Sequence, residues 1–252
     1  MNQKELQSFL DFKALQFESI AFIDHDPIQI PHQFTKKQDI EVAAFLTATI
    51  AWGNRVSILK SAQKLIDSMD ASPYDFVINH QKKDLIPFKG FVHRTFNEND
   101  LIYFFTALKN IYLKHQGLEK IFSNIEYSLQ ERIHHFKTIF FELNHLQRTQ
   151  KHVSDPQKGS AAKRINMFLR WMVRSNDKGV DFGLWKSISP SELSIPLDVH
   201  TGNIARKLGL LNRTQNDARA LSELDLNLRK FDPNDPVKYD FALFGLGAFE
   251  KF

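Results

Sequence analysis

Residues 39–52, which read DIEVAAFLTATIAW, constrain the fold more than any other part of the sequence. As a helix, this segment is apolar on nearly every side, and such a helix is stable only when other parts of the chain surround it. Asp39 is placed to cap its start, and Gly53 is placed to end it. Asn54 can then cap a second helix, so the sequence predicts two buried helices with a tight joint, as in a helical bundle or barrel.

The rest of the chain also has helical periodicity, and no alternation of apolar and polar residues is long enough to predict a strand. Glycine (10) and proline (9) are few among the 252 residues, which argues against turn-rich sandwiches, barrels and propellers. The predicted class is therefore all-α. The expected helices cover residues 3–23, 39–52, 54–69, 73–81, 99–114, 117–146, 160–174, 198–208, 215–229 and 236–247.

Composition excludes several classes of protein. The chain has no cysteine, so disulfides, zinc–thiolate sites, iron–sulfur clusters and cysteine nucleophiles are excluded. A net charge of +4 permits a nucleic-acid partner without requiring one. Residues 1–10 are polar, unlike a signal peptide, and the apolar stretch at 42–52 is too short to span a bilayer. We therefore expect a soluble cytoplasmic protein with no membrane partner, working as a monomer.

Positive charge is densest between Arg148 and Arg174, a segment that contains seven lysines or arginines and one acidic residue, Asp155. On a helix that begins near Ser160, one stripe is polar and the opposite stripe is apolar. The polar stripe holds Lys163, Asn166, Arg170 and Arg174, and the apolar stripe holds Ile165, Phe168, Leu169 and Met172. The polar stripe is suited to a phosphate backbone, although a solvated helix face explains it as well. In the first turn, the helix dipole disfavours the ammonium form of Lys163 and favours the nucleophilic free amine.

Residues 195–211 read IPLDVHTGNIARKLGLL, and Asp198 lies where a helix should begin after an extended entry. The simplest interpretation is an N-cap that accepts from the amide of His200 or Thr201. A capping aspartate stays ionised and rigidly aimed, so the same side chain is also a candidate catalytic carboxylate.

This segment resembles the V-D-T-H-V-x-R-V-x-x-R-L-G-L signature of the helix-hairpin-helix DNA glycosylases, an all-α superfamily with a two-lobed fold. Asp198 and His200 fall in register, as do Leu208-Gly209-Leu210. Weaker likenesses occur elsewhere: Gly159–Lys163 is similar to the hairpin's G-x-G-x-K, residues 42–55 to the first barrel helix, and residues 235–247 to the closing helix. The resemblance implies a helix-hairpin-helix-like element, a catalytic role for Asp198 and, as in the bifunctional members, attack of Lys163 on the sugar.

The sequence also departs from the superfamily pattern. Ala161 stands at the hairpin's second glycine, and 35 positions separate Lys163 from Asp198, a longer spacing than most members have. The archaeal 8-oxoguanine DNA glycosylases are nearest in this respect. Lys158 and Lys178 are rival lysines, but Lys178 lies in the loop sequence SNDKG with no helix to orient it, which favours Lys163.

Over nearly its full length the chain also resembles an uncharacterised bacterial family. The motifs of that family are D-P-[IV]-x-[IP]-P, A-W-G-N-R, F-V-H-R-T-F, F-L-R-W-M-V-R and P-L-D-V-H-T-G. They stand here at residues 26–31, 51–55, 91–96, 168–174 and 196–202. This likeness names no activity, so the functional hypothesis depends on the glycosylase resemblance.

That resemblance implies a DNA base-excision glycosylase, with or without AP-lyase activity, acting on a damaged base such as 8-oxoguanine in duplex DNA. Lys163 would attack C1′ of the flipped nucleotide, and Asp198 would stabilise the cationic sugar or deprotonate the nucleophile. The expected phosphate contacts are Arg55, Arg164, Arg170, Arg174 and His200. The expected base slot is formed by Trp52, Trp171, Phe182 and Trp185, each of which a Phe-rich chain could equally use in its core.

A non-catalytic nucleic-acid-binding protein that keeps the fold is the alternative. The two hypotheses differ in whether Lys163 and Asp198 converge in a cleft. By analogy with the superfamily, residues 40–170 would form a central barrel lobe, and residues 1–39 with 171–252 a second lobe.

No metal or cofactor is expected. The histidines at 93 and at 134–135 have no carboxylates at a matching spacing. Gly245-Leu246-Gly247 follows no strand, so it is not a dinucleotide fingerprint.

Overall fold

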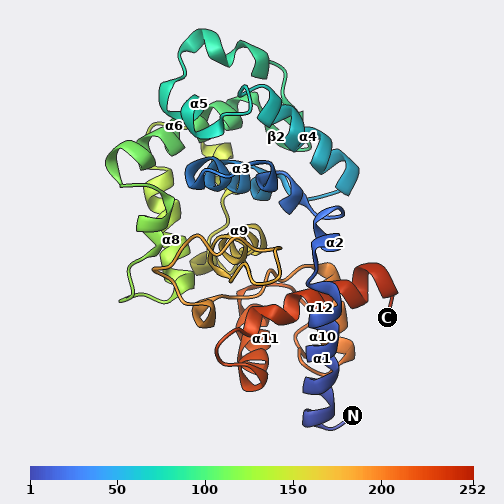
Figure 1. Ribbon diagram of the computed structural model, residues 1–252. Coiled ribbons are helices and arrows are strands. Elements are labelled where there is room, and N and C mark those ends of the chain that lie inside the picture. Colours follow the sequence, from blue (N-terminus) through green and yellow to red (C-terminus); the bar gives the residue numbers. More distant parts are fainter.

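Helix α3 (Lys37–Ile50) is the centre of the larger hydrophobic core in the computed structural model, which describes residues 1–252 (Figure 1). Every residue from Ile40 to Ile50 is buried, as the all-round apolar sequence predicts. Phe45 lies among four phenylalanine rings at centroid distances of 5.5–5.9 Å. Three helices pack directly on α3: α4 (Arg55–Asp67), α5 (Pro73–Asn79) and α9 (Lys163–Val173).

The remaining elements of this core confirm a mostly helical fold. They are α2 (Ile20–Ile23), α6 (Glu98–Lys114), α7 (Leu118–Phe122), α8 (Leu129–Phe140) and one hairpin of β1 (Val92–His93) with β2 (Phe96–Asn97). The sequence pattern did not predict this hairpin, whose strands have two residues each. Short 3₁₀ helices connect the elements at Pro27–Gln29, Pro31–Gln33, Lys82–Phe88, Gln147–His152, Pro156–Lys158, Pro190–Glu192 and Pro236–Lys238. No helix combines the length and the apolar character needed to cross a membrane.

A smaller core gathers both ends of the chain. It contains α1 (Gln3–Phe17), α10 (Val199–Lys207), α11 (Ala218–Phe231) and α12 (Tyr239–Gly245), which continues into a π-helical turn at Leu246–Glu250. Helix α1 lies along α12, so the two termini are tied together (Figure 1). The larger core also includes Phe22, Ile28 and Ile30, buried residues between Trp171 and Leu193, and Val237 and Phe241, whereas Ala161 belongs to the smaller core.

Side-chain caps fix where several helices begin. Asn2, Asn97 and Ser128 form capping boxes at the starts of α1, α6 and α8, and Asn54 caps α4 as expected. The predicted cap at Asp39 is wrong, because α3 already begins at Lys37. The Asp39 carboxylate instead accepts from the Tyr74 amide in the first turn of α5, at 2.9 Å.

Two expected helices are interrupted. The helix predicted over 117–146 divides into α7 and α8, because Asn124 accepts from the Glu126 amide and Ser128 starts a new helix. Such local side-chain bonds compete with helical ones. The helix predicted over 3–23 ends at Phe17, and the next residue, Glu18, bonds Arg174 of α9 at 2.7 Å.

Replacing Phe45 by alanine is expected to lower the free energy of unfolding by about 3–5 kcal/mol, because the ring's contacts are lost and a cavity remains. Leu113→Ala is the matched control: Leu113 is 62% exposed on α6, so its loss should change stability by about 0.5 kcal/mol or less. Urea unfolding measures both values. Equal losses in the two variants would contradict the central position of Phe45.

Candidate functional site

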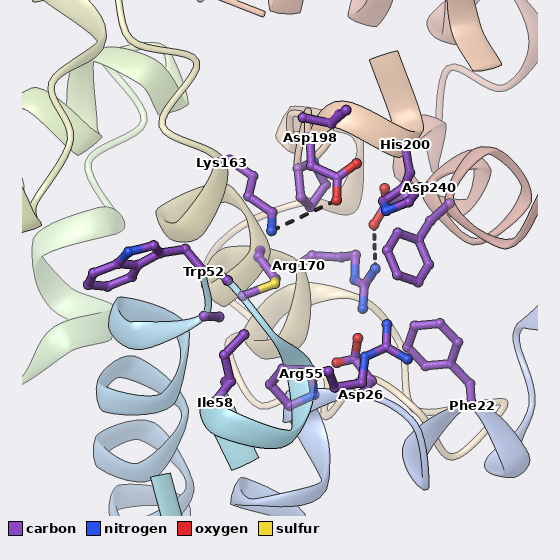
Figure 2. Close-up of a pocket in the computed structure, with 17 residues that line it drawn as sticks. Phe22, Asp26, Trp52, Arg55, Ile58, Lys163, Arg170, Asp198, His200 and Asp240 are labelled. Atoms are coloured by element: carbon purple, nitrogen blue, oxygen red, sulfur yellow. Dashed lines mark hydrogen bonds and ion pairs between the residues drawn. The ribbon is translucent and has the colours of Figure 1, made fainter. Parts of the chain in front are cut away.

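A pocket of about 440 Å³ lies where the two cores meet (Figure 2). Its volume falls within the range of small-molecule sites. The walls come from the segment after α2, the joint between α3 and α4, and helices α9, α10 and α12. Six lining side chains are charged: Asp26, Arg55, Lys163, Arg170, Asp198 and Asp240. The apolar walls include Phe22, Trp52, Ile58, Met167 and Phe244.

Lys163 and Asp198 face each other in this pocket, with 3.9 Å between Nζ and Oδ2 (Figure 2). Lys163 is the first residue of α9, which the chain enters through Ala162 in a left-handed conformation (φ 45°). Asp198 is the N-cap of α10, and its Oδ1 accepts from the Thr201 amide at 2.9 Å. One carboxylate oxygen therefore caps the helix while the other faces the lysine. The two side chains remain 34% and 17% exposed, so a ligand in the pocket can reach both.

The start of α10 is held in place by the segment that precedes α11. The Asn216 side-chain amide donates to the carbonyl of Asp198 at 2.8 Å. This approach requires Gly202, because a Cβ there would lie 2.6 Å from Asn216 Oδ1. The glycine of the P-L-D-V-H-T-G motif thus allows the close contact that positions the Asp198 backbone.

The prediction of a solvent-exposed basic stripe is wrong for Arg170 and Arg174, which are only 3% and 5% exposed. Arg170 pairs with Asp240 at 2.5 Å and with Asp181 at 3.3 Å. Arg174 pairs at 2.7 Å with each of Glu18, Asp181 and Asp235. Helix α9 lies between the two cores, so its polar face is buried against carboxylates from other segments. These two guanidinium groups are therefore not free to bind phosphates.

Two carboxylates that line the pocket, Asp26 and Asp240, were not among the site residues predicted from the sequence. Asp26 caps the 3₁₀ helix Pro27–Gln29, and burial raises its pKa against the opposing charge of Arg170 and other nearby cations. Burial also raises the pKa of Asp240 to about 6, although Arg170 opposes the shift. One sequence feature could have indicated Asp240: it is an acid between two aromatic residues, in Tyr239-Asp240-Phe241. An acid in an apolar segment is seldom buried unless it is paired, so its position suggests a partner.

Of the four aromatic residues predicted for a base slot, only Trp52 lines the pocket. The Arg164 guanidinium lies over the Trp52 ring, 4.6 Å from the ring centroid. Trp171 and Trp185 are fully buried in the larger core, and Phe182 packs at a tilt against the ring of His32, with 4.4 Å between centroids, and does not line the pocket. This part of the prediction is wrong because aromatic content does not distinguish a slot from a core.

The pocket uses two other aromatic rings. Phe22 and Phe244 line it from α2 and α12, edge to face at 6.1 Å. Neither residue was a candidate at the sequence level.

The remaining predicted phosphate contacts, Arg55, His200 and Arg164, differ in where the structure places them. Arg55 lines the pocket and forms no ion pair, and its guanidinium lies 5.7 Å from the Phe244 ring. His200 also lines the pocket and is exposed. Arg164 instead donates to the carbonyls of Thr49 and His152, and burial lowers its pKa to about 10.

The rival lysines Lys158 and Lys178 are exposed, and neither lines the pocket. Lys178 belongs to the long 175–197 segment, which covers the C-terminal end of α9. The amides of Phe182 and Trp185 donate there to the carbonyls of Trp171 and Met172.

The model of one protein family, described as a protein of unknown function (DUF2400), matches residues 26–249. The chain belongs to the DUF2400 family. The matched range includes every residue that lines the pocket except Phe22. No curated protein and no solved structure matches the chain.

In this DUF2400 chain, Arg174→Ala is expected to lower the free energy of unfolding by about 3–5 kcal/mol, because three carboxylates lose their shared cation. Arg213→Ala breaks a surface pair with Asp217 and a surface hydrogen bond to Gln215, both screened by solvent, so it should change stability far less than Arg174→Ala. Thermal unfolding separates the two, since about 1 kcal/mol corresponds to roughly 2–4 °C in a chain of this size. Small, equal shifts together with weaker DNA binding by the Arg174 variant would contradict the structural role.

Asp240 is expected to make stability depend on pH between about 4 and 6. Its pKa is about 6 in the folded protein against a reference of 3.8, so within this window the folded state binds more protons than the unfolded state. The contribution of Asp240 to the free energy of unfolding therefore falls as pH rises from 4 to 6, by on the order of 3 kcal/mol.

Asp240→Asn should remove that dependence, and urea unfolding across pH 4–7 measures it. Thr201→Val is the control: the Thr201 hydroxyl lies 3.4 Å from Asp240 but does not titrate in this range. Asp225, whose pKa burial also raises to about 6, keeps its own share of the slope. An unchanged slope in Asp240→Asn would therefore exclude Asp240 as a contributor.

Proposed function

We propose that this chain is a DNA base-excision glycosylase with AP-lyase chemistry, acting on a damaged base such as 8-oxoguanine in duplex DNA. The observation that carries the proposal is the meeting of Lys163 and Asp198. They lie 35 positions apart in sequence, yet their charged groups are 3.9 Å apart in a pocket between the two cores. A nucleotide must be flipped out of the duplex to reach such a pocket.

The proposed chemistry begins with attack of the free amine of Lys163 on C1′. The bond from C1′ to the base nitrogen breaks, and the base leaves with the bonding electrons. Asp198 takes the proton that the lysine nitrogen loses and stabilises positive charge on the sugar. As the bond from C1′ to the ring oxygen breaks, Asp198 returns its proton to that oxygen, which leaves a protonated imine. The departed base anion then takes a C2′ proton as the 3′ phosphate is expelled. Because 3.9 Å exceeds a direct hydrogen bond, proton transfer requires a closer approach or a bridging water.

The two-core arrangement supports the glycosylase-like fold that the sequence resemblance implies. In that interpretation, Gly159–Lys163 is the hairpin-like entry to α9. Gly159 is in the left-handed region, and a 3₁₀ turn at Pro156–Lys158 stands where the superfamily has a full helix.

Cations at the pocket support duplex DNA as the partner. Arg55 has no partner carboxylate, and Arg94 is exposed at the tip of the β1–β2 hairpin, close to Gly53. With Arg170 and Arg174 neutralised inside the protein, we assign phosphate contacts to exposed cations at the pocket mouth such as Arg94, which leaves Arg55 in the pocket lining open to the flipped nucleotide.

Borohydride trapping tests the proposal. Duplexes carrying 8-oxoguanine, uracil, an alkylated base or an abasic site are mixed with the protein and reduced, and a covalent protein–DNA band is sought. The wild type should give a band and Lys163→Ala should give none. Asp198→Asn should slow trapping by about 100-fold or more, while the fold is kept because asparagine is also a good N-cap.

Lys158→Ala is the matched control, since Lys158 is exposed, five positions before Lys163 and outside the pocket. It should trap like the wild type. A band that persists in Lys163→Ala would exclude Lys163 as the nucleophile. No band on any substrate, with DNA binding retained, would favour the non-catalytic binding protein or a glycosylase without lyase activity, which base-release assays with Asp198→Asn would separate.

A further inference from the structure

Asp26 offers an unused hydrogen-bond acceptor to the pocket. The residue is only 8% exposed, and its Oδ1 accepts from the Ile28 amide at 3.0 Å. Its other oxygen has no hydrogen-bond partner in the chain, and the side chain forms no ion pair although it lines the pocket (Figure 2). The free oxygen is not among the fully enclosed polar atoms of the chain, so it is reachable from the pocket, and a ligand there can donate to it.

Arg55 provides the complementary group beside it (Figure 2). The guanidinium is half-buried at the start of α4, forms no ion pair and has no hydrogen bond from its side chain. It lies close enough to act on Asp26 electrostatically, yet the two do not pair directly. The pocket therefore presents an acceptor and a set of donors next to each other, both unsatisfied by the protein.

The surrounding walls favour a flat ring. Phe22 and Phe244 lie on this side of the pocket, and Trp52 and Ile58 line it further along. Aromatic walls with a few convergent polar groups are typical of sites for planar heterocycles.

Among nucleobases, the polar pair distinguishes one hydrogen-bonding edge. The free oxygen of Asp26 has two lone pairs, and the guanine edge supplies two adjacent N–H donors, N1–H and the 2-amino group, with the O6 carbonyl alongside. Adenine places a lone pair at N1, and uracil has a single N–H between two carbonyls. Each would leave a buried group of the pocket unpaired.

We infer that Asp26 and Arg55 read a guanine-type base in this pocket: Asp26 accepts from N1–H and the 2-amino group, and Arg55 donates to O6. The inference rests on the proposed function and narrows its substrates to damaged guanines that keep this edge. Burial raises the pKa of Asp26, and Arg170, the Ile28 amide, Arg55 and Lys163 oppose that rise, so these groups act in favour of the ionised form that such acceptance requires.

Two duplexes that differ by one amino group test the role of Asp26. One carries 8-oxoguanine and the other 8-oxohypoxanthine, which lacks only the 2-amino group. A 2′-fluoro substitution on each blocks cleavage, so that fluorescence anisotropy reports binding alone. The wild type should prefer 8-oxoguanine by about 5- to 100-fold, the range for a good bidentate base contact. Asp26→Asn should abolish the preference, because the asparagine oxygen keeps the Ile28 amide and an NH2 donor then stands where the free carboxylate oxygen was.

Asparagine is as good a cap as aspartate, so Asp26→Asn should keep the Ile28 bond and the fold, which circular dichroism checks. Asp24→Asn is the matched control. Asp24 is exposed, lies two positions away and is not in the pocket, so this variant should keep the preference. A preference that survives in folded Asp26→Asn, or its absence in the wild type, would overturn the inference.

Arg55→Gln gives a second, different signature. Both lesions carry O6, so the variant should weaken binding to both by a similar factor, keep the preference between them and leave undamaged duplex unaffected. An equal loss on undamaged DNA would show that Arg55 contacts phosphate instead of O6, and would overturn that half of the assignment.

An abasic duplex separates this inference from the proposed function. It carries no base to read, so wild-type trapping on it depends only on the Lys163 chemistry. Trapping without any guanine preference would overturn the base-reading inference alone. A guanine preference without trapping would overturn the lyase chemistry and support the role of Asp26.

Discussion

Two buried arginines of α9 connect the two hydrophobic cores, and the pocket depends on them. Burying a guanidinium costs several kcal/mol unless carboxylates surround it with good geometry. Arg170 and Arg174 meet this condition with acids from the end of α1, the 175–197 segment, the entry to α12 and α12 itself. The partners are Glu18, Asp181, Asp235 and Asp240. Each segment that contributes a carboxylate is thereby fixed relative to α9.

The same helix that organises the cores also presents Lys163. Its polar face is partly exposed at Lys163 in the pocket and buried at Arg170, which also lines the pocket, and at Arg174, which does not. The long spacing between Lys163 and Asp198 has a structural reason as well. The intervening 175–197 segment bonds the C-terminal carbonyls of α9 and supplies Asp181, before the chain returns to place Asp198 opposite Lys163.

Local patterns in the sequence predicted local structure well. The all-round apolar segment around α3 is buried, Asn54 and Asp198 are caps, and the helical class is confirmed. Periodicity failed at α9 because a polar stripe looks the same whether it faces water or distant carboxylates, and the partner Asp240 lies 70 positions from Arg170. The open pair Asp26 and Arg55 was beyond the sequence for a similar reason. What makes these side chains notable is the lack of a partner, which only three-dimensional packing reveals.

The charge balance inside the pocket limits what can enter it. Asp26, Asp198 and Asp240 face Arg55, Lys163 and Arg170, so cations and carboxylates are equal in number. Lys163 pairs with Asp198 and Arg170 with Asp240, which leaves one acceptor and one donor group open. A phosphate inside would meet three carboxylates at short range, where repulsion is poorly screened. A neutral ring that carries both donors and acceptors would instead satisfy Asp26 and Arg55 without adding charge. The same balance therefore favours a base inside the pocket and a phosphate backbone that stays at its mouth.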